Sequence, residues 1–82
     1  MPSKEAQEIE HFVMTTARAL VDHPDGVEIT LLESGNIVVV ELTTASSDTG
    51  KVIGREGRMA QSLRTLVTAV ATKLRKKAIL QI

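Results

Sequence analysis

The chain has 82 residues, of which 43% are hydrophobic, and this length corresponds to a single domain with one modest core. It contains no cysteine, which excludes disulfides and thiolate metal sites and favours a reducing, cytoplasmic location. The first residues are charged, and the longest apolar run, residues 37–40, is far too short to cross a bilayer, so neither a secretory signal nor a membrane span is expected.

The formal net charge is zero, but the charges are divided unevenly along the chain. Residues 1–48 contain nine acidic and two basic residues, a net charge of −7, whereas residues 49–82 contain eight basic residues and one acidic residue, a net charge of +7. The basic second half predicts a surface that attracts phosphate groups. For the bases between residues 73 and 77 a second interpretation is equally good, because basic residues at the end of a helix stabilise its negative terminus.

Residues 3–22 are expected to form an amphipathic helix, which Ser3 can cap. Its apolar residues recur at helical spacing: Ile9, Phe12, Val13, Ala17, Leu20 and Val21. Pro24 and Gly26 then end the helix in a turn. Next, residues 27–33 alternate between apolar and polar side chains, which is typical of a strand with one exposed face.

Residues 34–36 are expected to form a hairpin connection to a second strand at residues 37–42. This second run is β-branched and almost continuously apolar, which favours a central strand with a parallel neighbour over an edge strand. The same run is also compatible with a sheet whose outer face meets a partner.

A short helical turn around residues 51–53 follows, with Ser47 or Asp48 as its cap. Gly54 is expected to end this turn in the left-handed conformation, and Gly57 to open a long helix that reaches about residue 76. Its buried stripe is expected to be Met59, Leu63, Leu66, Val67, Val70 and Leu74. Residues 78–82 form a final strand. The order α-β-β-α-α-β predicts an α+β fold, with three helices packed on one face of a three-stranded mixed sheet.

The loop Gly54-Arg55-Glu56-Gly57 carries the most distinctive chemistry. Its two glycines allow a ligand backbone to approach without meeting a Cβ atom. The first amides of the helix after Gly57 have no acceptors within the helix and lie at its positive end, which favours an anion. Two glycines at this spacing are weak evidence by themselves, since they usually mark only a turn.

Residues 52–58, Val-Ile-Gly-Arg-Glu-Gly-Arg between two helical patterns, resemble the signature of the KH domain, whose loop of this form clamps about four nucleotides of single-stranded RNA. The likeness extends over residues 8–82 and matches the type II arrangement. Residues 22–25 and 48–54 are similar to the KhpA family of small bacterial single-domain proteins. The resemblance implies one KH domain over residues 1–82.

The resemblance also implies a role for each site residue. Gly54, Arg55, Glu56 and Gly57 would contact the RNA backbone, Val40, Val52 and Ile53 would line the base groove, and Lys51 and Arg58 would neighbour the phosphates. Exchange of both glycines for aspartate is expected to abolish RNA binding and to leave the fold intact. Because Glu56 would repel a phosphate at contact distance by about 1 kcal/mol in water, we expect micromolar or weaker binding with little sequence preference.

The family further implies that the chain pairs with itself or with a KhpB (Jag or EloR)-like protein, and that it acts as an RNA chaperone or post-transcriptional regulator. A protein-interaction or dimerisation module with a KH fold and little RNA binding is the main alternative. An enzyme is not expected, since His11 and His23 should not converge and no second base or metal ligand accompanies either. No cofactor or metal is expected. Base stacking on aromatic rings is excluded, because Phe12 is the only aromatic residue and belongs to a core stripe.

Overall fold

The computed structural model describes residues 1–82. The elements follow in the order α1 (Lys4–Leu20), β1 (Glu28–Ser34), β2 (Ile37–Thr43), α2 (Thr49–Ile53), α3 (Arg58–Lys73) and β3 (Lys77–Gln81), with single 3-10 turns at Pro24–Gly26, Ser46–Asp48 and Arg55–Gly57. The expected order of helices and strands and the α+β class are confirmed.

The start of α1 is fixed by its cap. The Oγ atom of Ser3 accepts a hydrogen bond from the backbone N–H of Ala6 at 3.0 Å, which satisfies one of the free amides of the first turn. The buried face of the helix consists of Ala6, Ile9, Val13 and Ala17. Neither α1 nor any other helix combines the length and apolar character that would let it cross a membrane.

The three strands form one mixed sheet in the order β1-β2-β3. β1 and β2 pair antiparallel across a tight turn, whereas β2 and β3 pair parallel, because the intervening helices return the chain to the start of the sheet. Residues 37–42 therefore lie in the central strand beside a parallel neighbour, as their composition predicts.

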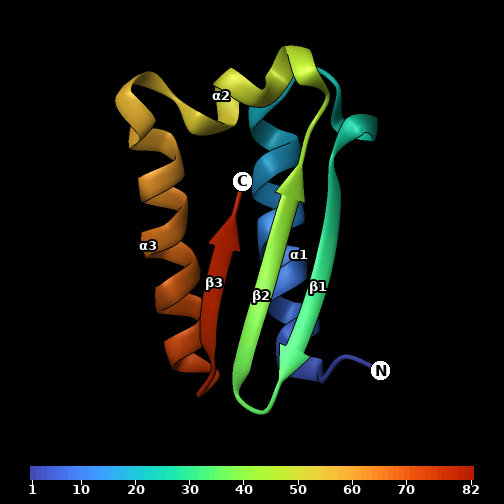
Figure 1. Ribbon diagram of the computed structural model, residues 1–82, viewed down its shortest axis with the longest axis vertical. Coiled ribbons are helices and arrows are strands. Elements are labelled where there is room, and N and C mark those ends of the chain that lie inside the picture. Colours follow the sequence, from blue (N-terminus) through green and yellow to red (C-terminus); the bar gives the residue numbers. More distant parts are fainter.

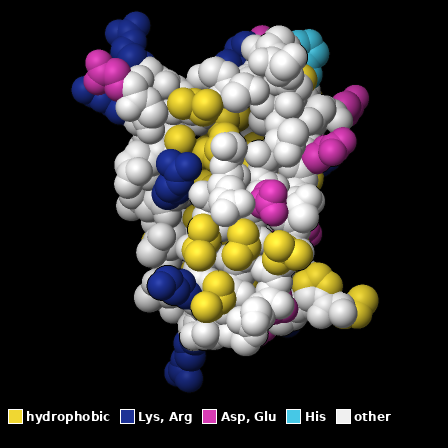
Figure 2. Space-filling view, viewed as in Figure 1, with side chains coloured by type: hydrophobic (Ala, Val, Ile, Leu, Met, Phe, Trp, Pro, Cys, Tyr) yellow, Lys and Arg dark blue, Asp and Glu magenta, His cyan; other side chains and the backbone are white.

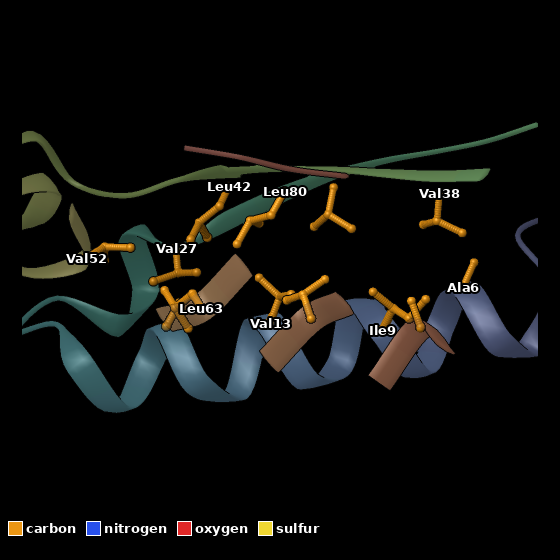
Figure 3. Packing of buried hydrophobic residues seen from close by; sticks show 13 residues of the cluster. Ala6, Ile9, Val13, Val27, Val38, Leu42, Val52, Leu63 and Leu80 are labelled. Atoms are coloured by element: carbon orange, nitrogen blue, oxygen red, sulfur yellow. The ribbon is translucent and has the colours of Figure 1, made fainter. Parts of the chain in front are cut away.

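α1 and α3 cover one face of this sheet, and α2 lies at one end of the helical layer (Figure 1). The side chains of Val38 and Leu42 point from β2 toward the helices (Figure 3). Val40 is buried in the same cluster, which also contains Ile9 and Val13 of α1. Strand alternation then directs the neighbouring residues of β2 to the opposite face of the sheet.

No helix covers that outer face. Leu32, Val39 and Ile79 lie opposite one another in register across the three strands, and Ile37 lies two residues from Val39. Leu32, Ile37 and Ile79 are 55%, 40% and 42% exposed. Figure 2 shows these apolar side chains as a row across the sheet. We call Leu32, Ile37, Val39 and Ile79 the apolar band.

The buried stripe of α3 differs from the expected one. Leu63 and Val67 are buried as predicted, but Met59 and Leu66 are 36% and 50% exposed. Ala60 and Ala71 occupy the buried face in their place. Both sets have helical spacing, so periodicity alone does not separate them; the small alanine side chains allow α3 to approach its neighbours closely.

α3 ends at Lys73, before the expected residue 76, in a Schellman motif. The N–H of Lys76 donates to the carbonyl of Ala71 at 2.8 Å, and the N–H of Arg75 donates to the carbonyl of Thr72 at 3.0 Å. Arg75 adopts a φ of 59° at the position where glycine is usual. A side chain in this left-handed conformation costs about 1 kcal/mol.

Candidate nucleic-acid interface

Gly54 joins α2 to the loop in a conformation that other residues avoid. Its N–H donates to the carbonyl of Gly50 at 2.9 Å, which closes the last turn of α2. Its φ of 76° is positive as expected, but its ψ of 175° is extended rather than left-handed helical, a combination adopted essentially only by glycine. A Cβ atom at this position would lie 2.5 Å from the Cβ and 2.9 Å from the backbone nitrogen of Met59. The first turn of α3 therefore lies directly against Gly54.

The next residues reverse the chain into α3. Glu56 and Gly57 both lie in the left-handed region, with φ of 56° and 74°, and the N–H of Gly57 donates to the carbonyl of Gly54 at 3.2 Å. No side chain caps the first turn of α3, and no atom of a residue beyond the immediate neighbours of Gly57 lies within 4 Å of the position of a Cβ on Gly57. The loop thus leaves the positive end of a 16-residue helix uncapped by any side chain.

Two arginines flank this helix start. Arg55 is exposed and forms no ion pair. The Nη2 atom of Arg58 lies 3.3 Å from Oε2 of Glu56, and these side chains are 80% and 71% exposed. An ion pair so open to water contributes little to stability, so either side chain can move away from it easily. Arg58 nevertheless offsets the negative charge of Glu56 at the loop.

Lys51 lies near the loop but is already engaged. Its Nζ atom lies 3.1 Å from Oδ2 of Asp22 and 3.4 Å from Oδ1 of Asp48. The hydrogen bond to Asp22, its charge, and the weaker contact with Asp48 raise the pKa of Lys51 above its ordinary value. A phosphate would have to share this ammonium group with two carboxylates.

The structural role of Asp48, which binds the segment after α1, was not predicted from the sequence. Its side chain does not cap α2, contrary to expectation, and is fully buried. Its Oδ2 atom accepts from the N–H of His23 at 2.9 Å and lies 3.0 Å from Nδ1 of the same residue, while Oδ1 accepts from the N–H of Asp22 at 3.3 Å. Asp48 therefore connects the segment after α1 to the start of α2 through hydrogen bonds. Because α2 leads directly into the loop, these bonds also help to position the loop.

These contacts also decide the charge of Asp48. Burial raises the pKa of this carboxyl, but the hydrogen bonds from the side chain and backbone of His23 and from the backbone of Asp22 outweigh it, so the pKa lies below its ordinary value. No local signal identifies this role, because the partners lie 25 and 26 residues earlier in the chain.

The expected base groove is only partly available. Val40 and Val52 are fully buried in the core, so neither side chain offers an exposed surface to a base in this structure. Ile53, which directly precedes Gly54, is 38% exposed, and Met59, which approaches Gly54 from the first turn of α3, is 36% exposed. The two hollows of the surface are lined by other residues: Lys4, Gln7, Glu8 and His11 in one, and Met1, Pro2, Leu31 and Glu33 in the other.

The family model for the KH domain of KhpA and KhpB matches residues 10–82. The chain belongs to this KH-domain family. The similarity predicted from the loop signature is thereby confirmed, and the arrangement of three helices and a mixed three-stranded sheet is the KH fold. The KhpA/KhpB KH family is not a family of enzymes.

Curated relatives agree with this assignment. The RNA-binding protein KhpA of Caldanaerobacter subterraneus is 49% identical, over 85% of this chain and 93% of its own. That of Aquifex aeolicus is 42% identical, over 90% and 94% of the two chains, and that of Listeria monocytogenes is 40% identical, over 90% and 97%. No solved structure matches the chain.

Proposed function

We propose that the chain binds single-stranded RNA without catalysing a reaction, and that the loop from Gly54 to Gly57 clamps the phosphate backbone. The observation that carries this proposal is the start of α3, which no side chain caps and which approaches Gly54 without an intervening Cβ atom. A phosphate can accept hydrogen bonds from amides there and meets the positive end of the helix. The relatives named above are RNA-binding proteins, which supports the same ligand.

The side chains around the loop have distinct parts in this proposal. Arg55 is free to pair with a phosphate, and Arg58 can exchange its exposed contact with Glu56 for one. Ile53 supplies an aliphatic surface for a base. Val52 and Val40 act from the core by positioning α2 and β2. Because contacts to phosphate and to aliphatic carbon carry little sequence information, the preference among RNA sequences is low.

The proposal extends to the wider role of the chain. Residues 1–82 act as one KH domain in the cytoplasm, as an RNA chaperone or post-transcriptional regulator. A KhpB (Jag or EloR)-like protein is a suitable partner, because one family model describes the KH domains of both KhpA and KhpB. A surface that pairs two copies of this chain would then suit a mixed pair.

An NMR titration with a single-stranded RNA of four nucleotides tests the clamp. Amide shifts centred on residues 51–58 that weaken as salt rises are the expected result. The decisive variant is Gly57→Asp, which adds a negative charge at the loop where no atom obstructs the side chain. Gly35→Asp is the matched control, since Gly35 has the same type of positive φ, equally open space, and a place in the β1–β2 turn.

The clamp requires Gly57→Asp to lose these shifts while Gly35→Asp keeps them. Equal RNA binding by both variants would refute the clamp. The double exchange of Gly54 and Gly57 is unsuitable, because a side chain on Gly54 collides with the backbone of Met59 and would disturb the fold as well as binding. The close approach of Met59 argues against the expectation that this exchange leaves the fold intact.

The apolar band favours a second function, pairing of the domain with another copy or with a KhpB-like domain. Its exposed side chains form one uncharged row in register across the sheet. Such a row is compatible with its own copy, since like side chains can stack face to face. Sedimentation over a range of concentrations should show a dimer that the double change Leu32→Ser and Ile79→Ser dissociates. A wild-type chain that stays monomeric alone and with a KhpB domain would exclude this function.

A further inference from the structure

One edge of the molecule has no acidic residue. From Gly57 to Ile82 the chain contains neither Asp nor Glu, and this segment forms α3 and β3, which pack against each other at the side of the sheet (Figure 1). Beyond the loop, three exposed bases lie where α3 meets β3: Arg64, Arg75 and Lys77. We call these three residues the basic edge. None of them forms an ion pair, whereas the neighbouring Lys76 is paired with Glu33.

The basic edge starts near the loop and reaches the opposite end of the molecule. α3 has 16 residues and is therefore about 24 Å long. Arg64 lies near the middle of α3, where its Nε atom donates to the carbonyl of Leu80 at 3.2 Å, which holds the side chain against β3. Figure 2 shows Lys and Arg side chains following one another down the α3 side of the outer face.

The helix dipole does not account for this arrangement. Basic residues in the last turn of a helix do stabilise its negative end, and Lys73 and Arg75 are placed for that role. Arg64 is in the middle of α3 and Lys77 is in β3, and at neither position does the helix dipole stabilise a positive charge. The acidic residues of the chain all lie outside this edge, and neither Arg64 nor Lys77 forms an ion pair, so no carboxylate partner explains the two charges.

The backbone at Arg75 is a second, independent sign. Arg75 has a φ of 59° in the motif that ends α3, a place where glycine would fit without strain. A charged side chain is present there in spite of the strained backbone. Strain of this kind is a reason to look for a function of the side chain.

We propose that RNA held by the loop continues along the basic edge, so that the binding site is longer than the clamp. This inference rests on the proposed RNA-binding function. The distance from Arg58 to Lys73 along the helix is about 22 Å, and a stacked strand advances about 3.4 Å per nucleotide. The edge therefore accommodates about six nucleotides beyond the roughly four of the clamp.

Two oligouridylates, of four and twelve nucleotides, test this proposal by fluorescence anisotropy at several salt concentrations. The longer RNA should bind with a steeper dependence of log K on log salt, since each phosphate contact adds about 0.7 to the slope for a single strand. The slope is the decisive quantity, because the additional binding registers of a longer RNA raise its affinity without changing the slope.

The double change Arg75→Gln and Lys77→Gln should reduce the slope for the twelve-nucleotide RNA by about 1.4 and weaken its binding several-fold. Binding of the four-nucleotide RNA should not change. Lys4→Gln with Arg18→Gln is the matched control, since it removes two exposed bases from α1 and changes the net charge equally. This control should leave the slope for both RNAs as it is in the wild-type chain.

Arg75→Gly provides a readout that a structural role would not produce. It removes the strain at Arg75 and should therefore make the fold more stable while it weakens binding of the longer RNA. The same slope for both RNAs, or the same loss in the Arg75 and Lys77 variant as in the α1 control, would overturn the proposal. If neither RNA binds the wild-type chain, the clamp fails and the basic edge fails with it; binding of the short RNA with no effect of length refutes the basic edge alone.

Discussion

Gly54 and Met59 lie so close together that the loop and the first turn of α3 form one packed unit. A Cβ atom on Gly54 would lie 2.5 Å from the Cβ, 2.9 Å from the nitrogen and 3.2 Å from the Cα of Met59. Gly57, at the other end of the loop, has open space around it and only its positive φ to satisfy. The two glycines of the signature therefore serve different physical needs.

Gly54→Ala should consequently destabilise the fold much more than Gly57→Ala. The collision with Met59 and the glycine-only backbone together should cost about 3 kcal/mol of unfolding free energy at Gly54. At Gly57 the left-handed strain alone should cost about 1 kcal/mol. Urea denaturation measures both values, and equal losses for the two variants would contradict the close approach of Met59.

Arg75→Gly should stabilise the chain by up to about 1 kcal/mol, because it places glycine in the left-handed position of the Schellman motif. Arg75→Ala removes the same charge and keeps the strain, so this control should give no gain. The urea midpoints of the two variants and of the wild-type chain show whether the gain comes from the backbone or from the loss of charge. A gain in Arg75→Ala as large as in Arg75→Gly would show that charge repulsion, rather than the backbone, was relieved.

Periodicity was enough to predict the arrangement of the strands. Apolar and polar side chains alternate in residues 27–33, as in a strand with one solvent-exposed face, whereas residues 37–42 are almost continuously apolar. This difference distinguished β1 at the edge of the sheet from β2 at its centre. Periodicity was not enough to predict which side chains of β2 face the core, since residues 37–40 are all apolar and β-branched. The resemblance to the KH family, rather than the strand pattern, assigned Val40 to the ligand groove, and in the structure this side chain lies in the core.

The candidate site could be proposed from the sequence where its chemistry is local. The two glycines and their neighbouring arginines are consecutive in the chain, and their motif led to the family. Asp48 and Lys51 depend on Asp22 and His23, which lie more than 20 residues earlier, and no local pattern reveals such a contact. Short-range rules instead predicted a helix cap for Asp48, because aspartate before a helix usually has that role.

Glu33 should make the fold sensitive to acid. Its carboxylate accepts hydrogen bonds from the hydroxyl of Ser3, from the backbone N–H of Ser3 at 2.8 Å and from Nζ of Lys76 at 3.0 Å. These contacts, with those from Ser3 the largest, lower the pKa of Glu33 from 4.5 to about 2. The folded state thus binds fewer protons than the unfolded state, so this contribution is complete above about pH 5 and is lost as the pH falls from 4.5 to about 2.

The variant Glu33→Gln should therefore be less stable than the wild-type chain near pH 7, and the two stabilities should converge as the pH falls toward 2. Urea unfolding at a series of pH values measures the difference. Glu28→Gln is the matched control, because Glu28 is exposed in the same strand and forms no ion pair. A difference between wild-type chain and Glu33→Gln that stays constant between pH 2 and pH 7 would contradict the network.

Asp48→Asn should loosen both the fold and the loop. The buried carboxylate accepts from two backbone amides and faces Nδ1 of His23, whereas an asparagine side chain has one acceptor oxygen and would turn an NH₂ group toward one of these donors. Because the pKa of Asp48 is lowered, its contribution is present above its ordinary pKa of 3.8 and is lost as the pH falls through the lower folded value.

We expect Asp48→Asn to lower the urea midpoint at pH 7 and to shift the amide resonances of residues 49–58, since α2 loses its attachment to the segment after α1. Affinity for a four-nucleotide RNA should fall as well, although Asp48 itself is buried and cannot touch the ligand. Asp25→Asn, an exposed aspartate in the turn after α1, should change none of these quantities. Unchanged loop resonances in a destabilised Asp48→Asn variant would mean that Asp48 supports the core without positioning the loop.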